Sequence, residues 1–493
     1  MSPALVAAIT YFVVLSVVVS LWARKRVKTG SDFVTGGGSL AWPLVMAGFV
    51  LAPLGAGHTL SLWEQSSSLG AAVLWWGIMS GGLMVPLFLL WFGPWFRRLK
   101  VQTFPEGMGK LFGEKIGWVI SAVFPAQLLG ICIAEVLATA TAFYALSGGA
   151  IEFNPHCIIL AIVFTIFYVF VGGLMQAAWM NLFNAVVLIG GSFIAVFYTG
   201  GWLSRDGRGG WDGIAEHYAQ EGAAWKTNLM NFSPEVIFSL ILPCLILTVF
   251  MQSASQVQNQ PMLMARSESD IRRGVFWASF INSLAAFPWV VLGLVGMAIP
   301  MIAAKADAAK LSVPELALMA FPTWLIALLM TSLLAATLST TGVLILGASH
   351  IIVHDILKRA VNPGMSERTF LILTRAVIIV CAVLVFVPAL RNPGIMPLLY
   401  WIFSFAIPVF GIYLIGMLWK VNKVAAWSTL LAGYAANFLW TFLVQAQPPE
   451  WLPGYLNLNV YPTMLATLLF GVVLNLILPG EPGYLRQLKT KER

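Results

Sequence analysis

Long apolar stretches alternate with short polar connections along almost the entire chain. A stretch of about 20 apolar residues is long enough to cross the hydrocarbon core of a bilayer as a helix. The pattern therefore predicts an all-α polytopic membrane protein. We expect thirteen membrane-spanning helices, near residues 4–23, 42–69, 71–96, 117–147, 157–172, 178–200, 235–256, 274–303, 315–350, 370–389, 395–419, 423–445 and 459–478.

Composition agrees with this interpretation and excludes several other classes. Apolar residues make up 59% of the 493 residues and charged residues 10%, against about 45–50% and about 25% in soluble domains. The net charge of +8 is spread over many connections, so no nucleic-acid partner is expected. The four cysteines lack the spacing of a metal site or of a disulfide framework.

The positions of the basic residues indicate how the helices are oriented. A basic cluster, Arg24 to Lys28, follows the first apolar stretch instead of preceding it, so this stretch is expected to be a retained helix and not a cleavable signal peptide. Most of the 28 Lys and Arg residues fall in odd-numbered connections or in the tail. By the positive-inside rule we expect the amino terminus outside the cell and the carboxyl terminus inside, in the plasma (cytoplasmic) membrane.

Two helices, five apart along the chain, carry helix-breaking residues. The second helix contains Pro53 with Gly55 and Gly57, and the seventh contains Pro243 before the polar run 252–256. Discontinuous helices at matching positions of two repeats are typical of inverted-repeat secondary transporters, where freed carbonyls coordinate a cation near the midplane. Proline and glycine also occur in ordinary membrane helices, so the pair alone leaves both interpretations open.

The ninth helix carries a cluster of hydroxyl side chains over residues 336–342, Ala-Thr-Leu-Ser-Thr-Thr-Gly. Hydroxyl and carbonyl oxygens are hard, neutral ligands that suit a small monovalent cation. The same hydroxyls can instead bond to carbonyls one turn earlier in their own helix and pack helices together. From the residues alone, a cation site and a structural role are both open.

Motifs along nearly the whole chain resemble those of the sodium:solute symporter family, which includes bacterial proline, pantothenate and sugar symporters. They occur in the family's order and at its spacing, which makes the set specific. The motifs are Ser31–Leu40, Thr103–Glu106 with Phe112-Gly113, Gly172–Leu174 leading to Trp179, Gln258–Gly274, the ninth-helix stretch that ends at His354–Lys358, and Gly416–Lys420.

The resemblance implies a five-plus-five inverted-repeat core, made by the second to eleventh helices, that couples inward movement of sodium to solute uptake by alternating access. It implies a transporter and not an enzyme, with sodium as coupling ion and no other cofactor. The chain then divides into an outer first helix and inside loop (1–41), the transport core (42–419), and two peripheral helices with a cytoplasmic tail (420–493). The sodium ligands carried over from the family are the hydroxyls of Ser339 and Thr340 and the carbonyls of Leu51, Leu54 and Ala336.

The chain departs from the family's pattern at two places. Asn181 and Asn184 stand where the family often has an acidic residue and a Gln, which affects ion release or a second ion site. In the second helix, the family's small residues and glycines are replaced by His58, Trp63, Glu64 and Gln65. The solute site is therefore expected to differ from that of a familiar sugar or proline carrier.

Glu64 and Glu135 are the acidic residues deepest in the predicted spans, and no Lys or Arg is expected within a span to pair with them. A charge there costs about 3 kcal/mol, so each carboxyl is expected to be protonated, bonded between helices, or facing a cation or His58. With sodium held by neutral oxygens, such a site favours an amino acid or other nitrogen-containing solute. The candidate solute-binding residues are His58, Glu64, Trp76, Glu135, Gln252 and Trp401.

Other functions are open at this point. A proton-coupled permease would use the buried glutamates, and a sodium-coupled monocarboxylate transporter would hold its solute at the amino-terminal end of a broken helix. A sensor would be expected to carry an output domain. His350, His354 and Asp355 offer weak support for an enzyme, because near the inner surface they are expected to be ordinary interfacial residues.

Overall fold

The computed structural model describes residues 2–24, 39–51, 56–92, 101, 103–254 and 261–491. Most of this part is helical, and a short antiparallel pair joins β1 (Lys420–Val421) to β2 (Glu481–Pro482). Nine helical runs of the described residues are long and apolar enough to cross a membrane. The all-helical, multi-pass architecture expected from the sequence is confirmed.

The helices follow the predicted spans closely. The first half of the chain contains α1 (Pro3–Arg24), α3 (Trp42–Leu51), α4 (Ala56–Leu69), α5 (Leu74–Met84), α7 (Phe104–Phe112), α8 (Glu114–Leu146), α9 (Ile158–Arg205) and α10 (Gly210–Gln220). The second half contains α11 (Pro234–Val236), α12 (Leu242–Leu247), α14 (Glu268–Met297), α15 (Pro300–Ala303), α16 (Ala308–Ala320), α17 (Thr323–His350), α18 (Glu367–Ala389), α19 (Ile395–Ser404), α20 (Ala406–Leu418), α21 (Lys423–Leu439), α22 (Val460–Leu468), α23 (Leu474–Ile477) and α24 (Tyr484–Lys491).

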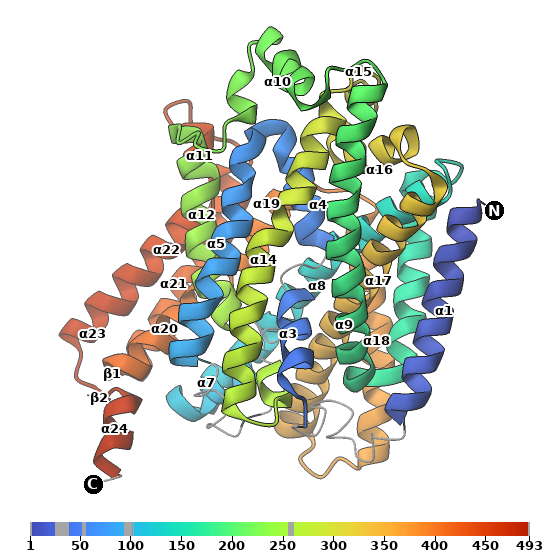
Figure 1. Cartoon of the computed structure of the whole chain (residues 1–493). Helices are drawn as coiled ribbons and strands as arrows, with labels where there is room; N and C mark the ends of the chain where they lie inside the picture. Colours follow the sequence, from blue (N-terminus) through green and yellow to red (C-terminus); the bar gives the residue numbers. More distant parts are fainter. Residues whose placement is uncertain are drawn as a thin grey trace.

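The bundle has two distinct ends. Helices α10 and α15 lie at one end, and α7 and α24 lie at the other (Figure 1). We call these the α10 end and the α7 end. Helix α1 begins towards the α10 end, whereas the last helix lies at the α7 end, so the two termini are on opposite sides of the bundle (Figure 1).

The second predicted span consists of two helices in the structure. Helix α3 ends at Leu51 and α4 begins at Ala56, and residues 52–55 between them lie outside the described part. Helix α3 is anchored at its start, because the backbone N–H of Trp42 donates to Asp270 Oδ1 at 2.9 Å. The segment before it pairs with the second half of the chain through a bridge between Leu40 and Ala265.

The seventh predicted span is not interrupted at its proline. The chain stays helical from Pro234 to Ala254, and π-helical turns η6 (Ile237–Ile241) and η7 (Thr248–Gln252) flank α12, which contains Pro243. The wider π-helical turn accommodates an extra residue. Residues 255–260, which include the end of the predicted polar run, lie outside the described part, and helical residues resume at 261.

Two other boundaries differ from the sequence prediction. The fifth and sixth spans fall within one continuous run of helical residues, α9. The ninth span was expected to begin at residue 315, but α17 begins at Thr323, after Phe321-Pro322 ends α16. Helix α16 is therefore a separate element at the α10 end, and most of its residues are buried.

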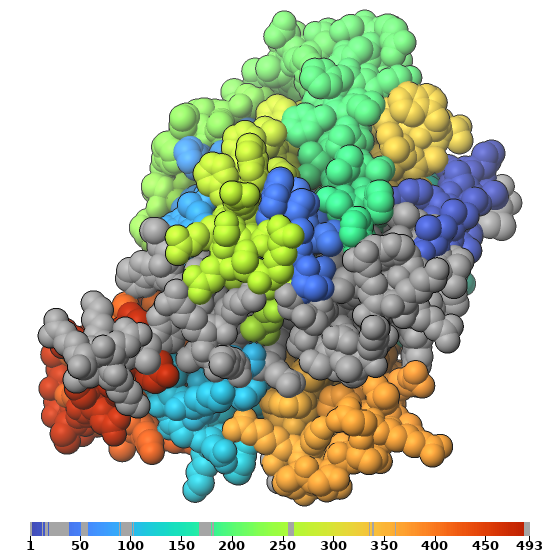
Figure 2. All heavy atoms as spheres, turned by 60° about the horizontal axis from the view of Figure 1, so that its bottom comes forward, coloured from blue at the N-terminus to red at the C-terminus, as the bar shows by residue number. Residues whose placement is uncertain are grey.

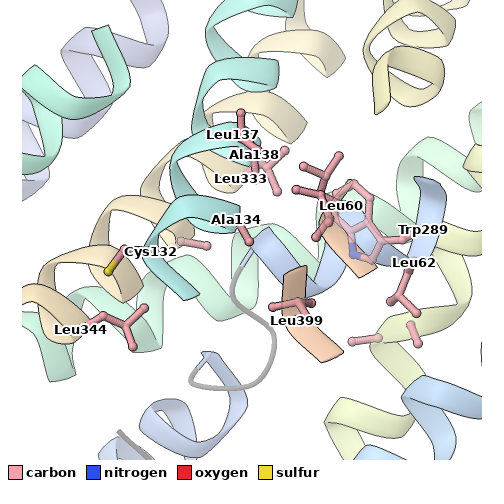
Figure 3. Close-up of a cluster of buried hydrophobic side chains, with 14 of the residues drawn as sticks. Leu60, Leu62, Cys132, Ala134, Leu137, Ala138, Trp289, Leu333, Leu344 and Leu399 are labelled. Atoms are coloured by element: carbon pink, nitrogen blue, oxygen red, sulfur yellow. The ribbon is translucent and has the colours of Figure 1, made fainter. Parts of the chain in front are cut away.

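The core lies where α17 packs against α8 and α9 and where α14 packs against α3, α4 and α5. In Figure 3, Leu60 of α4 and Trp289 of α14 lie close together, and Ala138 of α8 lies beside Leu333 of α17. These side chains are buried, and alanines and glycines between them allow close approach of the backbones. A Cβ at Gly293, for example, would lie 2.8 Å from the Cα of Trp63.

Candidate functional site

Three helices bring aromatic and imidazole rings together in the half of the bundle near the α10 end. The indole Nε1–H of Trp76 on α5 donates to Nδ1 of His58 on α4 at 2.9 Å. Because Nδ1 accepts this bond, a neutral His58 carries its proton on Nε2. The Trp76 ring also lies 5.8 Å from the ring of Tyr400 on α19, so α4, α5 and α19 share one group of rings.

One helical turn beyond Trp76, the same face of α5 is polar. Ser80 Oγ accepts a hydrogen bond from Gln252 Nε2 at 2.8 Å. Among the described residues, Gln252 Oε1 and the hydroxyl of Ser253 are buried without a hydrogen-bond partner. Buried polar atoms are almost always bonded, so these two oxygens are candidates to bind a ligand. We call this group the central polar site, with the residues His58, Trp76, Ser80, Gln252, Ser253 and Tyr400.

The central polar site lies where elements from both halves of the chain meet. The thiol of Cys244 on α12 lies 3.6 Å from the carbonyl oxygen of Trp76, which holds α12 against α5. The Tyr400 hydroxyl donates to the carbonyl of Ser239 at 2.6 Å. A molecule bound here would contact α4 and α5 from the first half and η7 and α19 from the second.

Three threonines of the hydroxyl cluster, Thr337, Thr340 and Thr341, are buried and bonded within α17. The Thr340 hydroxyl donates to the carbonyl of Ala336 at 3.0 Å, and Thr341 donates to the carbonyl of Thr337 at 2.7 Å. This is the structural arrangement considered from the sequence. It also places two of the expected sodium ligands, Ala336 O and Thr340 Oγ1, side by side, and Thr340 Oγ1 keeps acceptor capacity after donating its hydrogen.

The other expected sodium ligands are only partly described. Leu51 is the last residue of α3, whereas Leu54 lies outside the described residues. Ser339 is helical, but its side chain belongs to the part that is not described. Asn184, at one of the two positions that depart from the family, accepts a bond from the Tyr11 hydroxyl at 3.4 Å.

Glu64 has a basic partner in the structure. The expectation that no Lys or Arg would pair with it was wrong. Its Oε1 lies 4.0 Å from the ammonium of Lys310, and its Oε2 accepts the backbone N–H of Ile395 at 3.2 Å. The predicted spans 274–303 and 315–350 leave Lys310 in the connection between them, but in the structure it lies on α16, which packs against α4 and α8, and it is buried. Glu64 therefore joins α4 to α16 and to the start of α19.

Lys310 is held by several oxygens at once. Its ammonium donates to Asn392 Oδ1 at 2.7 Å, to Pro393 O at 2.8 Å and to Asn392 O at 3.0 Å. Burial lowers the pKa of Lys310, and the nearby carboxylates of Glu64 and Asp307 act in the opposite direction. These contacts join α16 to α4 at the α10 end through a buried ammonium and a carboxylate that is 17% exposed.

The remaining two candidates lie elsewhere. Glu135 is 2% exposed on α8, one turn from Cys132, whose thiol lies 4.0 Å from the carbonyl of Thr341. Glu135 thus lies on the side of α8 that faces the hydroxyl cluster of α17. The sequence analysis had assigned it to the solute site. The ring of Trp401 packs against Phe405, which lies between α19 and α20, and against Phe438 of α21, so the structure does not bring it into the central polar site.

Sequence reasoning missed Ser80, Tyr400 and the burial of Lys310. Ser80 is four residues after Trp76 and therefore on the same helical face, so the spacing alone could have identified it. Tyr400 precedes Trp401, the residue chosen from the sequence. Neighbouring residues of a helix point about 100° apart, so the two rings face different helices. Nothing in the local sequence of Lys310 indicates that α16 folds inward.

Comparison with known proteins identifies a family over most of the chain. The model of the sodium:solute symporter family matches residues 33–433. The sodium/myo-inositol cotransporter 2 of Rattus norvegicus is 24% identical over 88% of this chain and 69% of its own length. The sodium/glucose cotransporter of Vibrio parahaemolyticus is 22% identical over 94% of this chain and 87% of its own length.

Solved structures show the same fold. A substrate-bound, outward-open sodium-coupled sialic acid symporter matches with a TM-score of 0.79 at 16% identity, covering 97% of this chain and 99% of that one. A nucleobase-cation-symport transporter in a closed conformation matches with a TM-score of 0.58 at 13% identity, covering 90% and 94% of the two chains. The fold class predicted from the sequence, an all-α transporter with an inverted-repeat core, is confirmed by these likenesses.

Proposed function

Since this chain belongs to the sodium:solute symporter family, a family of transporters and not of enzymes, we propose that it couples sodium influx to the uptake of a small neutral polar solute. A sodium ion that moves down about 100 mV releases roughly 2.3 kcal/mol. This free energy supports about fifty-fold accumulation of a neutral solute. The observation that carries the proposal is the central polar site between the two halves of the chain.

Sodium is proposed to bind between α17 and the end of α3. The ligands would be the Ala336 carbonyl, the hydroxyls of Ser339 and Thr340, and the carbonyls of Leu51 and Leu54. The 3.0 Å separation of Ala336 O and Thr340 Oγ1 supports this assignment, because ligands of one small cation must lie close together. Glu135 would then add a carboxyl group near the ion and not near the solute.

The solute is proposed to bind at the central polar site. The Trp76 and Tyr400 rings offer apolar faces, and Gln252 Oε1 with Ser253 Oγ offers acceptors to a molecule that carries hydrogen-bond donors. Glu64 is already paired with Lys310, which removes one of the carboxylates on which the expectation of a cationic amine rested. A polyol or sugar, as in the names of the relatives, fits these groups, and so does an uncharged nitrogen-containing solute.

An amino acid or amine is the second candidate, and one observation favours it. Glu135 is a carboxyl group that is 2% exposed on α8. A carboxylate at this depth would attract a cationic group of a solute. Proton coupling would use the same carboxyl group, and both alternatives can be separated from the main proposal by one uptake experiment.

The proposal predicts sodium-dependent uptake of a neutral solute by purified protein in vesicles. We expect saturable uptake of labelled myo-inositol, glucose or a neutral amide when sodium is present, and loss of that uptake when choline replaces sodium at fixed pH. Glycine, a simple amine and acetate form the comparison set. Uptake that is equal in choline, or that follows an imposed pH difference, would contradict sodium coupling; uptake of the amine alone would contradict the neutral solute.

The same assay tests the central polar site. Trp76→Phe removes the indole N–H that holds the His58 ring in place and reduces the aromatic surface offered to the solute. We expect the solute concentration for half-maximal uptake to rise about tenfold, which corresponds to about 1.4 kcal/mol of binding free energy. Trp75→Phe is the matched control, because the neighbouring indole bonds to Leu229 O outside the site. Equal effects of the two substitutions would contradict the assignment.

The orientation and division of the chain are also proposed. The amino terminus and the α10 end would face outward, the α7 end and carboxyl terminus would face the cytoplasm, and residues 42–419 would form the transport core in the plasma membrane. A tag inserted within 205–209 is then expected to be accessible from outside intact cells, and a tag after Lys489 only after permeabilisation. The reverse labelling pattern would overturn this orientation.

A further inference from the structure

A buried carboxylate at the α7 end of α17 joins three elements. Asp355, in the π-helical turn η8 (Ile351–Val361) that continues α17, is 0% exposed. Its Oδ2 accepts the hydroxyls of Thr103 at 3.0 Å and Ser121 at 3.1 Å, and its Oδ1 lies 2.7 Å from His354 Nδ1. Thr103 also caps α7 by accepting the N–H of Glu106. Asp355 therefore holds η8 against both α7 and α8.

His354 is the group of this cluster that a proton from solvent can reach. Its side chain is 21% exposed, whereas that of Asp355 is 1% exposed. A neutral His354 offers one hydrogen bond to Asp355, and protonation places a full positive charge beside the carboxylate. Because a buried carboxylate is costly unless it is paired, protonation of His354 strengthens its attachment to Asp355.

Of the two histidines that the structure describes in this cluster, only His354 forms a hydrogen bond with Asp355. The ring of His350, one turn earlier on α17, stacks on His354 with a centroid distance of 5.0 Å and packs edge-on against Phe370 of α18. Within the described residues, neither ring nitrogen of His350 has a hydrogen-bond partner. Two imidazolium rings this close would repel each other, so His350 is expected to stay neutral while His354 takes the proton.

The other charged groups on the packed elements are paired or exposed. The pairs are Lys358 with Glu367 at 3.1 Å, Arg359 with Glu114 at 3.3 Å, and Lys110 with Glu106 at 3.7 Å. Lys115 on α8 and Arg368 and Arg375 on α18 are exposed. Protonation of His354 therefore changes the net charge at the cluster without competing for another carboxylate.

We propose that His354 and Asp355 form a proton-dependent clamp that fastens the α7 end of α17 to α7 and α8. Figure 2 shows the residues of α7 beside those that follow η8 on this face. The clamp tightens when His354 is protonated and loosens when it is neutral. The consequence for transport rests on the proposed function. The clamp lies on the side through which sodium held by α17 would leave. Acid on that side is therefore expected to slow uptake.

Hydrogen exchange of the purified protein, without sodium or solute, tests the clamp directly. Peptides covering 104–121 and 346–361 are compared at about pH 7.5 and about pH 5.5, after correction for intrinsic rates. In the native protein we expect protection of both peptides to rise about threefold to tenfold at the lower pH. In His354→Gln protection is expected to be the same at both pH values.

Two further variants keep the test decisive. His156→Gln removes an exposed imidazole that lies 3.4 Å from the exposed Glu152, and it is expected to keep the pH response of the native protein. Asp355→Asn retains an acceptor for Thr103 and Ser121 and is expected to lose the response. A native protein with pH-independent protection, or a His354→Gln variant that keeps the response, would overturn the clamp. Neither result would bear on sodium-coupled uptake, which the vesicle assay measures separately.

Discussion

Replacing Lys310 with Met is expected to lower the free energy of unfolding by about 1–3 kcal/mol, because it leaves Glu64, whose side chain is 17% exposed, without its charged partner. The ammonium also bonds to Asn392 Oδ1 and to the carbonyls of Asn392 and Pro393. The loss would be measured as a lower midpoint of thermal unfolding of the purified protein in detergent. Because the pair joins α16 to α4 at the α10 end, the variant is also expected to show faster hydrogen exchange in residues 308–320.

A second substitution separates the lost pair from a general packing defect. In the double variant Lys310→Met with Glu64→Gln, no charge is left buried, and we expect more than half of the lost stability to return. Arg208→Met is the matched control, because its partner Asp206 lies at 2.7 Å on the exposed surface, where such pairs contribute about 0–1 kcal/mol. Additive losses in the double variant would contradict a coupled, buried pair.

Replacing Thr340 with Ala is expected to raise the sodium concentration for half-maximal uptake about tenfold or more. Removal of an oxygen that binds a charged partner costs about 1.5–3 kcal/mol, and about 1.4 kcal/mol corresponds to a factor of ten. The measurement is the sodium dependence of initial uptake rates in vesicles. Solute affinity at saturating sodium is expected to change much less.

The neighbouring hydroxyl provides a strict control for this prediction. Thr341 is as deeply buried as Thr340 and bonds within the same helix, but it points roughly 100° away around the helix axis. Thr341→Ala is expected to leave the sodium dependence of uptake unchanged. Thr340→Ser keeps the hydroxyl group and is expected to show a sodium dependence close to that of the native protein. If Thr341→Ala has the larger effect, the cation site lies on the other face of α17.

The fold could be predicted from the sequence because hydropathy and charge act over whole segments. A bilayer requires each span to be apolar and helical, so the all-helical, multi-pass architecture follows from the sequence with few alternatives. Boundaries set by a single turn were harder to place. The separation of α16 from α17 at Phe321-Pro322 depends on how α16 packs against α4 and α8, which no local pattern reveals.

The site was predicted less completely, for a related reason. His58, Trp76 and Gln252 were proposed from the sequence, and the structure brings them into one group of residues. The assignment of Glu64 to the solute assumed that no basic residue would pair with it. Its partner Lys310 lies far along the chain, so the local sequence did not reveal the pair. Trp401 and Tyr400 are adjacent in the sequence, and only packing determines which ring faces Trp76 and which faces Phe405.

The π-helical turns on either side of α12 give this helix an unusual sensitivity to its own length. Each such turn holds one residue more than an α-helical turn, and one residue corresponds to a rotation of roughly 100°. The direction of Gln252 towards Ser80 thus depends on both η6 and η7. A deletion of one residue within η6 would be absorbed, because its π turn can relax to an α turn, whereas a deletion of one residue within α12 would rotate every later side chain by roughly 100° away from its partner. Such a deletion would harm solute binding more than a conservative replacement of Gln252 itself.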